Sequence, residues 1–268
     1  MKKQIMVIVI IFLLLVGVFS GCMEETSKNE SNTIYVDING NGDFISIQDA
    51  INAANDDDII FVRKGTYYES LSITKTINII GEDKNTTILS GKYAEGIDPL
   101  ISLEADNCSI QKFTFTNRTN SLLNCIFLTR SSKNIIKNNN IIGFNLGIYI
   151  LTSSDSNTIS DNFISNNEYG INIKGGEHNN VSKNNIKNNN RGIYCCCGAE
   201  YNEIHFNNFF ENYEYGAIET SSLMNYWDNN YWDDYTGTDN DNDGYGDNPY
   251  DIPSGTNKDS KPLMNPFG

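Results

Sequence analysis

The hydrophobic and polar residues of this chain recur at a fixed spacing between residues 134 and 232. Two asparagines and two apolar residues form the pattern N-x-I-x-x-N-x-I, which returns every 22 or 23 residues. Its first asparagines are Asn134, Asn157, Asn179, Asn202 and Asn225, and its second are Asn139, Asn162, Asn184, Asn207 and Asn230. The apolar pairs are spaced as in short strands rather than on one helix face. The period therefore predicts a repeat architecture with one strand-rich coil per repeat.

A second repeated element, G-I-x-[IC], begins at Gly147, Gly170 and Gly192. A coil of about 23 residues closes on itself, and the next coil then stacks about 4.8 Å above it in parallel register. Equivalent apolar residues form interior ladders, and equivalent asparagines gather at the corners, where they adopt turn conformations and bond to adjacent coils. The sequence thus predicts an all-β fold, a right-handed parallel β-helix stabilised by stacking.

Both ends of such a solenoid expose strand edges, so each end needs a cap. Residues 46–55 place four apolar residues on one helix face, and Ser46 with Asp49 resembles a capping box. We therefore expect a short helix over the first coil. At the other end Trp227 and Trp232 replace the aliphatic ladder residues and are expected to close the stack. The β-helix is predicted to span residues 33–235, followed by an acidic C-terminal tail over residues 236–268.

The first 32 residues are organised differently. A basic start, an apolar run over residues 5–19 and two small residues precede Cys22, which is the order of an export signal. The Phe-Ser-Gly-Cys ending resembles a lipoprotein signal, and this resemblance implies that Cys22 is lipidated and anchors the chain to a membrane. An uncleaved anchor helix is the alternative. We interpret residues 1–22 as the lipoprotein signal and the polar residues 23–32 as a tether; the rest lies outside the membrane at the cell surface.

Composition and charge narrow the range of partners. Asparagine accounts for 41 of the 268 residues, and the formal net charge is −15. Abundant asparagine is typical of many tight turns, in agreement with the repeat. A polyanion repels phosphate backbones, so the charge argues against a nucleic-acid partner and favours cation binding.

Three consecutive cysteines, Cys195, Cys196 and Cys197, form a candidate site for a soft metal such as copper(I). The alternative, which we favour, is that Cys195 packs as a small hydrophobe in a repeat position and that its neighbours are incidental.

The acidic tail contains a second candidate metal site. Residues 239–247 read D-N-D-N-D-G-Y-G-D, and positions 1, 3, 5 and 9 of a calcium loop correspond to Asp239, Asp241, Asp243 and Asp247. Asp251, one place after the usual position 12, is a fifth candidate ligand. The prediction is an exposed calcium site with a structural role, and the alternative is a solvated acidic loop.

One row of outward-pointing residues is a candidate binding surface for polysaccharide. Tyr149, Asn172 and Tyr194 occupy the middle of the glycine-started strands in three successive coils. The tyrosines are expected two coils apart, about 9.6 Å, which approximates a disaccharide repeat. Aromatic faces stack on sugars, and amides bond to hydroxyl groups. The alternative is that exposed tyrosines simply favour strands.

Two regions resemble known families. The stretch from Tyr35 to Gly81, with G-T-Y-x-E, is similar to the first coils of pectin methylesterases and other pectin-lyase-like β-helices. The asparagine-rich repeats and the tail beginning N-Y-W-D-N-N-Y-W-D-D resemble NosD-like proteins, a family named for a periplasmic protein of copper-site maturation. The resemblance covers nearly the whole mature chain and implies a parallel β-helix fold. It implies no particular activity, because this fold hosts many activities.

No catalytic constellation is evident in the sequence. The motif strings of pectin methylesterases and polygalacturonases are missing, and His178 and His205 are interpreted as exposed turn residues. We therefore expect a non-catalytic surface lipoprotein that binds carbohydrate or serves as an envelope scaffold. A calcium-dependent polysaccharide lyase and a NosD-like copper-handling accessory protein are the alternatives. The sequence points to no particular protein partner.

Overall fold

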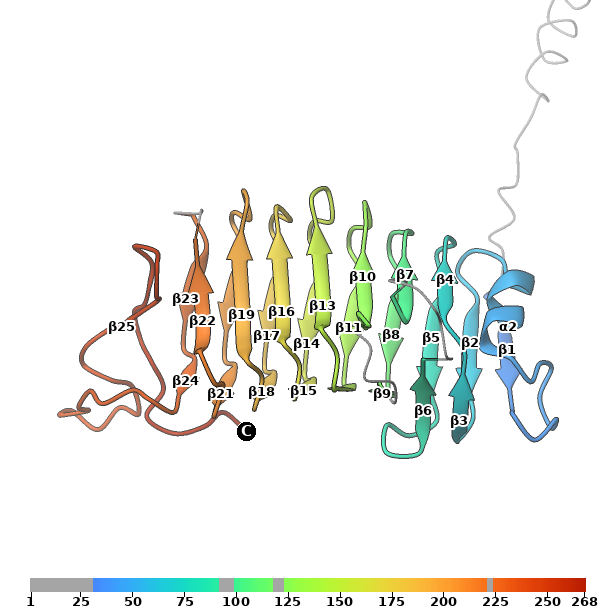
Figure 1. Ribbon diagram of the computed structural model, residues 1–268, viewed down its shortest axis with the longest axis horizontal. Helices are drawn as coiled ribbons and strands as arrows, with labels where there is room; N and C mark the ends of the chain where they lie inside the picture. Colours follow the sequence, from blue (N-terminus) through green and yellow to red (C-terminus); the bar gives the residue numbers. More distant parts are fainter. Residues whose placement is uncertain (1–30, 92–98, 118–122, 221–223) are drawn as a thin grey trace, which may run out of the picture. The chain divides into compact units, whose positions relative to one another are not determined.

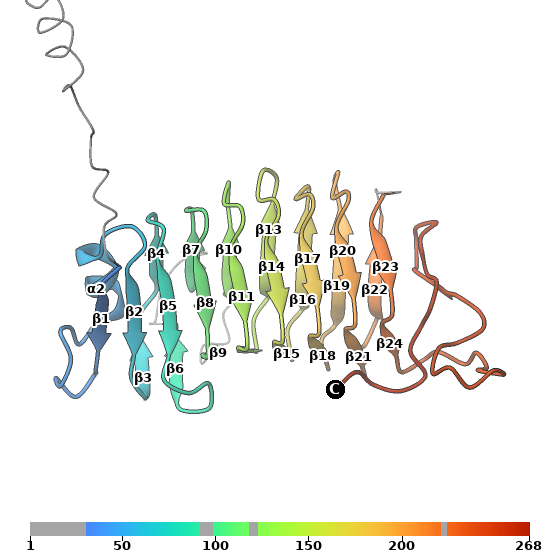
Figure 2. The ribbon, with the colours of Figure 1, turned by 180° about the vertical axis from the view of Figure 1, so that it is seen from behind.

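Short parallel strands stack coil upon coil from residue 33 to residue 232 (Figures 1 and 2). The predicted parallel β-helix is therefore confirmed. The computed structural model describes residues 31–91, 99–117, 123–220 and 224–268. The signal, Cys22 and residues 23–30 of the tether lie outside the described residues. Within the described part, none of the helices has the length and apolar character needed to cross a membrane.

Three sheets form the walls of the solenoid, and each full coil adds one strand to each sheet. Sheet A contains, in spatial order, β1 (Thr33–Val36), β2 (Ile59–Val62), β5 (Asn78–Gly81), β8 (Ser109–Gln111), β11 (Ile135–Lys137), β14 (Thr158–Ser160), β17 (Asn180–Ser182), β20 (Glu203–His205), β23 (Tyr226–Asp228), β26 (Lys258–Asp259) and β25 (Tyr250–Asp251). Sheet B contains β3 (Gly65–Tyr68), β6 (Thr87–Ser90), β9 (Thr114–Thr116), β12 (Asn140–Ile142), β15 (Phe163–Ser165), β18 (Asn185–Lys187), β21 (Asn208–Phe210) and β24 (Tyr231–Trp232). Sheet C contains β4 (Leu71–Ile73), β7 (Ile101–Leu103), β10 (Ile126–Leu128), β13 (Leu146–Leu151), β16 (Tyr169–Lys174), β19 (Arg191–Cys196) and β22 (Tyr215–Glu219).

The repeated apolar residues form the interior ladders that the period predicts. In sheet A the buried ladder is Ile136, Ile159, Val181, Ile204 and Trp227, one residue from each of five successive strands. In sheet B it is Ile141, Ile164, Ile186, Phe209 and Trp232. Because each coil covers its neighbour, these side chains lose contact with water only through stacking.

The repeated glycine of G-I-x-[IC] has a steric cause. A Cβ atom at Gly192 would overlap the carbonyl oxygen of Gly216 in the next coil. The coil backbones therefore approach one another too closely at this corner for any side chain.

Buried asparagines connect the coils at the corners. Along the column that runs from Asn139 to Asn230, each side-chain Nδ2 donates to the Oδ1 of the asparagine one coil further on, at 2.9–3.2 Å. The column from Asn157 to Asn225 repeats this arrangement at 2.9–3.0 Å. These contacts confirm the predicted bonds to adjacent coils. The left-handed turn conformation, however, falls on the residue before the repeated asparagine, as at Lys133 and Asn138. A third column, Asn167, Asn189 and Asn212, was not recognised from the sequence, although it has the same period.

The N-terminal cap is the helix α2 (Ile47–Ala53), within the expected range of residues 46–55. Ser46 is its N-cap, and Ser46 Oγ accepts the backbone N–H of Asp49 at 3.2 Å. Glu69 supplies the remaining acceptors, because its carboxylate receives bonds from the Ser46 hydroxyl and from the N–H groups of Ile47 and Gln48. The glutamate of G-T-Y-x-E thus attaches the cap to the coil beneath it.

The last coil is closed by residues 233–268, which turn back onto it. Tyr250 stacks on Trp232 with ring centroids 4.2 Å apart, so the aromatic ladder continues into the cap. Two fully buried carboxylates end the asparagine columns. Asp259 Oδ2 accepts the backbone N–H and the Nδ2 of Asn230, and Glu219 Oε1 accepts the Nδ2 of Asn225. The cap therefore combines the aromatic closure expected from the sequence with anionic acceptors.

Candidate binding face of sheet C

The row predicted to bind polysaccharide lies on the outer face of sheet C. Strand pairing places Tyr149 beside Asn172 and Asn172 beside Tyr194, with Phe127 before them. Both tyrosines are partly exposed. The Phe127 and Tyr149 rings meet edge to face, with their centroids 4.7 Å apart. We call Phe127, Tyr149, Asn172 and Tyr194 the sheet C strip. Phe127 was not singled out from the sequence because its coil departs from the consensus repeat.

Asn172 is the least accessible member of the strip. It is only 9% exposed between its two tyrosine neighbours, and its Oδ1 accepts no hydrogen bond within the described part of the chain. Leaving a buried amide oxygen without a donor costs about 1–3 kcal/mol. The oxygen is also shielded from water, so a sugar hydroxyl would recover that free energy once the flanking side chains move apart. The strip thus combines aromatic faces with an unused acceptor.

The three consecutive cysteines do not share one environment: Cys195 and Cys196 lie on opposite faces of β19, and Cys197 follows the strand. Cys195 is completely buried in the interior ladder next to Ile173, which confirms its interpretation as a small core residue. Burial raises the pKa of the Cys195 thiol well above its ordinary value, and the nearby Glu219 carboxylate adds to this. Cys195 therefore does not share a surface with its two neighbours.

Cys196 and Cys197 lie together at the end of the sheet C strip. The two sulfur atoms are 2.8 Å apart, and Cys196 pairs with Lys174 across the sheet. Burial, together with the adjacent Cys197 thiol, raises the pKa of Cys196 to about 11. Cys196 is therefore protonated at neutral pH, and a soft metal would have to displace its proton in order to bind.

The positive charge of Arg191, at the edge of the sheet C strip, is neutralised by two carboxylates. Arg191 forms ion pairs with Glu168 and Glu214, and its guanidinium carbon lies 4.7 Å from the centre of the Tyr169 ring. Because two carboxylates hold this cation, it connects successive coils at the edge of the strip.

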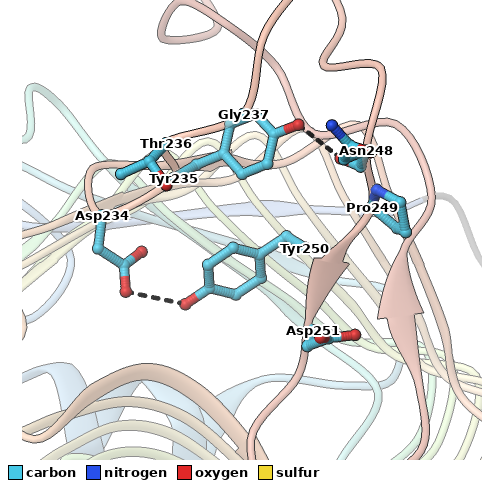
Figure 3. Close-up of a pocket in the computed structure, with 8 residues that line it drawn as sticks. All are labelled: Asp234, Tyr235, Thr236, Gly237, Asn248, Pro249, Tyr250 and Asp251. Atoms are coloured by element: carbon cyan, nitrogen blue, oxygen red, sulfur yellow. Dashed lines mark hydrogen bonds between the residues drawn. The ribbon is translucent and has the colours of Figure 1, made fainter.

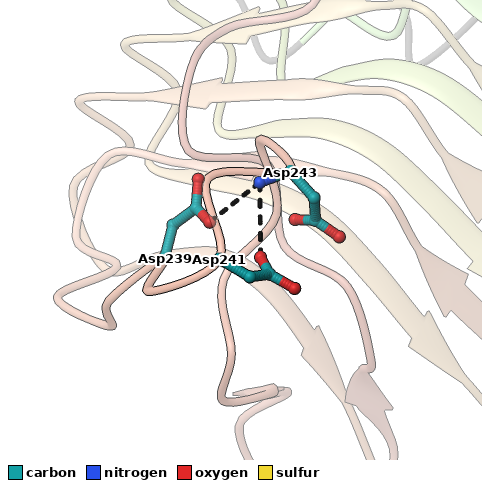
Figure 4. Close-up of side chains that lie close together, drawn as sticks. All are labelled: Asp239, Asp241 and Asp243. Carbon is teal, nitrogen blue, oxygen red and sulfur yellow. Dashed lines mark hydrogen bonds between the residues drawn. The ribbon is translucent and has the colours of Figure 1, made fainter.

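The acidic loop brings three of its five candidate ligands together (Figure 4). One carboxylate oxygen each from Asp239, Asp241 and Asp243 lie within 4.8 Å of one another. The backbone N–H of Asp243 donates to both of the other carboxylates, at 3.1 and 3.3 Å. The remaining two residues are engaged elsewhere: Asp247 accepts bonds from Asn240, and Asp251 forms an ion pair with Lys258 at 2.7 Å. The three-residue group is thus the part of the loop that could hold a hard cation.

A cavity of about 490 Å³ lies within the C-terminal cap, lined by residues between Asp234 and Asp251 (Figure 3). Tyr250 donates its hydroxyl to Asp234 at 3.1 Å, and Tyr235 donates to the carbonyl of Asn248. Both phenols therefore bind groups of the protein itself, and this cavity belongs to the packing of the cap.

The two histidines differ in their environments. His178 is exposed in a turn and stacks on Tyr201, as the sequence predicts. The same interpretation is wrong for His205, which ends strand β20 and is half-buried. The chain turns from sheet A to sheet B between Ile204 and Phe209, and this turn begins at Phe206. His205 therefore still belongs to the strand.

Comparisons with known proteins agree with this architecture. A family model described as "Periplasmic copper-binding protein (NosD)" matches residues 25–237. No curated protein matches the chain. Among solved structures, ORF18 of Geobacillus virus E2 aligns with a TM-score of 0.55 at 16% identity, covering 69% of this chain and 43% of that one. The A-module of the mannuronan C-5 epimerase AlgE4 of Azotobacter vinelandii aligns with a TM-score of 0.58 at 15% identity, covering 69% and 58%. The chain thus spans about half the length of these two structures, and at such identities the likeness shows the fold alone.

Proposed function

We propose that this chain, which belongs to the NosD family, is an exported β-helix protein that binds polysaccharide along the sheet C strip. The observation that carries the proposal is the alignment of Phe127, Tyr149 and Tyr194 in one row of partly exposed aromatic side chains, with the unused acceptor of Asn172 among them. Sugar rings stack on aromatic faces, and sugar hydroxyls satisfy amide oxygens.

Membrane attachment is part of the same proposal. A lipid on Cys22, following a cleaved signal over residues 1–22, would hold the β-helix at the cell surface through the tether. The role is non-catalytic in this proposal, because the strip offers stacking faces and an amide but no pair of carboxylates flanking a bond. The bound polysaccharide would then be retained at the envelope.

Replacing both Tyr149 and Tyr194 by alanine is expected to weaken polysaccharide retention about 10- to 100-fold, because each stacked ring contributes about 0.5–1.5 kcal/mol. A panel of polysaccharides incubated with purified residues 31–268 measures this by affinity electrophoresis. Tyr213→Ala, at an 86% exposed tyrosine that precedes β22 and is not part of the strip, is the matched control and should retain wild-type binding.

The panel also separates the other functions that the sequence leaves open. It is run with and without calcium, because Asp239, Asp241 and Asp243 are the candidate calcium ligands. Release of unsaturated, ultraviolet-absorbing ends would replace the binding role by a calcium-assisted lyase. Equal retention by the double variant and by wild type would remove the strip as the binding surface.

A second candidate function is copper handling. The family description names copper binding, and the neighbouring thiols of Cys196, which is buried, and Cys197, which is exposed, offer two soft ligands. Glycan binding remains the leading proposal because it uses all four residues of the sheet C strip, whereas the two cysteines lie beside the strip.

Changing Cys196 and Cys197 together to serine is expected to abolish copper(I) binding at this surface, whereas Cys195→Ala should leave it intact because Cys195 faces the interior. Competition with a chromogenic copper(I) chelator measures the affinity. Because the thiol of Cys196 has a raised pKa and binding releases protons, the affinity should increase with pH. Unchanged copper binding in the double serine variant would eliminate this candidate.

A further inference from the structure

A groove on the outer face of sheet A lies on a different wall from the sheet C strip. It has a volume of about 330 Å³ and is lined by Glu203, His205, Tyr226, Asp228 and Asn229, which we call the sheet A groove. Figure 2 shows β20 and β23 as neighbouring strands, and their pairing sets Glu203 beside Tyr226 and His205 beside Asp228. Four side chains therefore stand at the corners of a rectangle of about 4.8 by about 6.6 Å. A single pyranose ring has comparable dimensions.

Tyr226 lines the groove with an aromatic ring that is exposed to solvent, while its backbone is held in place. The residue is 59% exposed, and its backbone N–H is held by the Asn202 carbonyl at 2.8 Å. The inward neighbour Trp227 is buried in the ladder, so the strand cannot rotate to hide the tyrosine. A ring held in this way suits stacking on a flat apolar face, and sugars offer such a face.

Asp228 is held in a fixed position by other polar groups. Its Oδ1 accepts the Ser260 hydroxyl at 3.0 Å, and its Oδ2 accepts the Asn229 side chain at 2.6 Å. A carboxylate has about four acceptor positions, so each of these oxygens can receive a further hydrogen bond. Together with Glu203 it gives the groove two directed acceptors and a local negative charge.

His205 supplies the complementary donor. Asn180 Nδ2 lies 3.0 Å from His205 Nε2, and Asn180 Oδ1 accepts the Ser182 hydroxyl at 2.7 Å. In this arrangement the amide donates to Nε2, and the neutral ring carries its proton on Nδ1. Burial lowers the pKa of His205, so the ring is neutral at neutral pH and offers one N–H. Hydroxyl groups both donate and accept, and they match this combination of one donor and two acceptors.

We propose that the sheet A groove binds one unit of a glycan that carries no carboxylate, either a neutral hexose or an amino sugar, with Tyr226 stacked on the ring and Glu203, Asp228 and His205 bonded to its polar groups. The two carboxylates repel uronates, so charge selects against an acidic sugar. This site is separate from the sheet C strip and does not depend on the function proposed there.

The test uses the imidazole NMR signals of residues 31–268, since the chain has only two histidines and His178 serves as an internal reference. Cellobiose, a glucosamine disaccharide and glucuronic acid are titrated separately to about 10 mM, which detects millimolar affinity. We expect the first two sugars to shift the His205 signal, with His178 unchanged and glucuronic acid without effect. The relative response to cellobiose and to the glucosamine disaccharide distinguishes a neutral from a cationic ligand.

Variants assign the effect to the groove. Tyr226→Ala should weaken the sugar-induced shift of the His205 signal about tenfold. Tyr213→Ala, which changes an 86% exposed tyrosine outside the groove, should not weaken it. The double variant at Tyr149 and Tyr194 should also respond normally, which separates this site from the strip. Unchanged dispersion of the amide spectrum verifies that Tyr226→Ala is folded. The proposal is overturned if neither disaccharide shifts His205, if glucuronic acid acts equally well, or if the folded Tyr226→Ala protein responds like wild type.

Discussion

Replacing Asn184 by leucine is expected to destabilise the β-helix by about 4 kcal/mol, since about 1 kcal/mol is lost for each of four buried hydrogen bonds. Asn184 Oδ1 accepts the backbone N–H and the Nδ2 of Asn162, and its own Nδ2 donates to the Ile159 carbonyl and to Asn207 Oδ1. Leucine has a similar volume but can make none of these bonds, and its neighbours are shielded from water. Urea unfolding followed by circular dichroism measures the loss.

The adjacent Asn185 is the matched control for this variant. It lies on the outer face of β18, where it is exposed. Asn185→Ala should change the unfolding free energy by less than about 1 kcal/mol. If both variants lost the same stability, the buried asparagine columns would not be what holds the coils together.

Removing the carboxylate of Asp259 is the second large effect that we expect. Asp259 Oδ2 accepts three donors, namely the backbone N–H and the Nδ2 of Asn230 and the indole N–H of Trp232, while Oδ1 accepts the N–H of Lys261. Asp259→Ala leaves these groups buried without an acceptor and should cost about 3–5 kcal/mol. Tryptophan fluorescence reports the unfolding directly, because Trp227 and Trp232 both lie in the last coil.

Asp259→Asn should be intermediate, since its oxygen retains the bonds to Asn230 and Trp232 while its NH₂ group faces the N–H of Lys261. If Asp259→Ala were as stable as wild type, the anionic closure of the asparagine column would contribute nothing to the cap.

The stability of the wild-type protein relative to the Asp259→Asn variant should depend on pH. Burial raises the pKa of Asp259 above its ordinary value of 3.8. Because the folded protein then binds the proton more readily than the unfolded chain, the titration of Asp259 favours folding fully below the unfolded pKa, and this contribution declines as pH rises through the folded pKa. As the pH rises above the ordinary pKa of 3.8, the stability of wild type relative to Asp259→Asn should therefore fall.

The direction of the amide columns explains why a carboxylate suits their C-terminal end. Every Nδ2 in the column from Asn139 to Asn230 donates toward the next coil, so the aligned amides present N–H groups at the C-terminal end. Aligned dipoles of this kind favour an anion at their donor end, as at a helix N-terminus. Asp259 and Glu219 occupy those positions. Asp259 lies outside the repeat, whereas Glu219 stands at the repeat position that Ile173 and Cys195 hold in the two preceding coils.

The sequence by itself determined the architecture of this protein, because the architecture is periodic. A residue that recurs every 22 or 23 positions experiences the same environment in every coil, so Ile136 and Ile159 had to share one interior ladder, and Asn162 and Asn184 one corner column. The same logic placed Tyr149, Asn172 and Tyr194 in one outward row.

Only the tertiary structure decided the features that break the period. Asp259 closes a column that ends 29 residues earlier at Asn230, and Glu69 reaches back to the helix that begins at Ile47. The sheet A groove joins residues whose roles depend on what packs around them, and His205 is half-buried there rather than exposed in a turn. Such contacts arise from how the chain ends fold onto the stack. A local pattern carries no information about them, because each joins segments with no shared spacing.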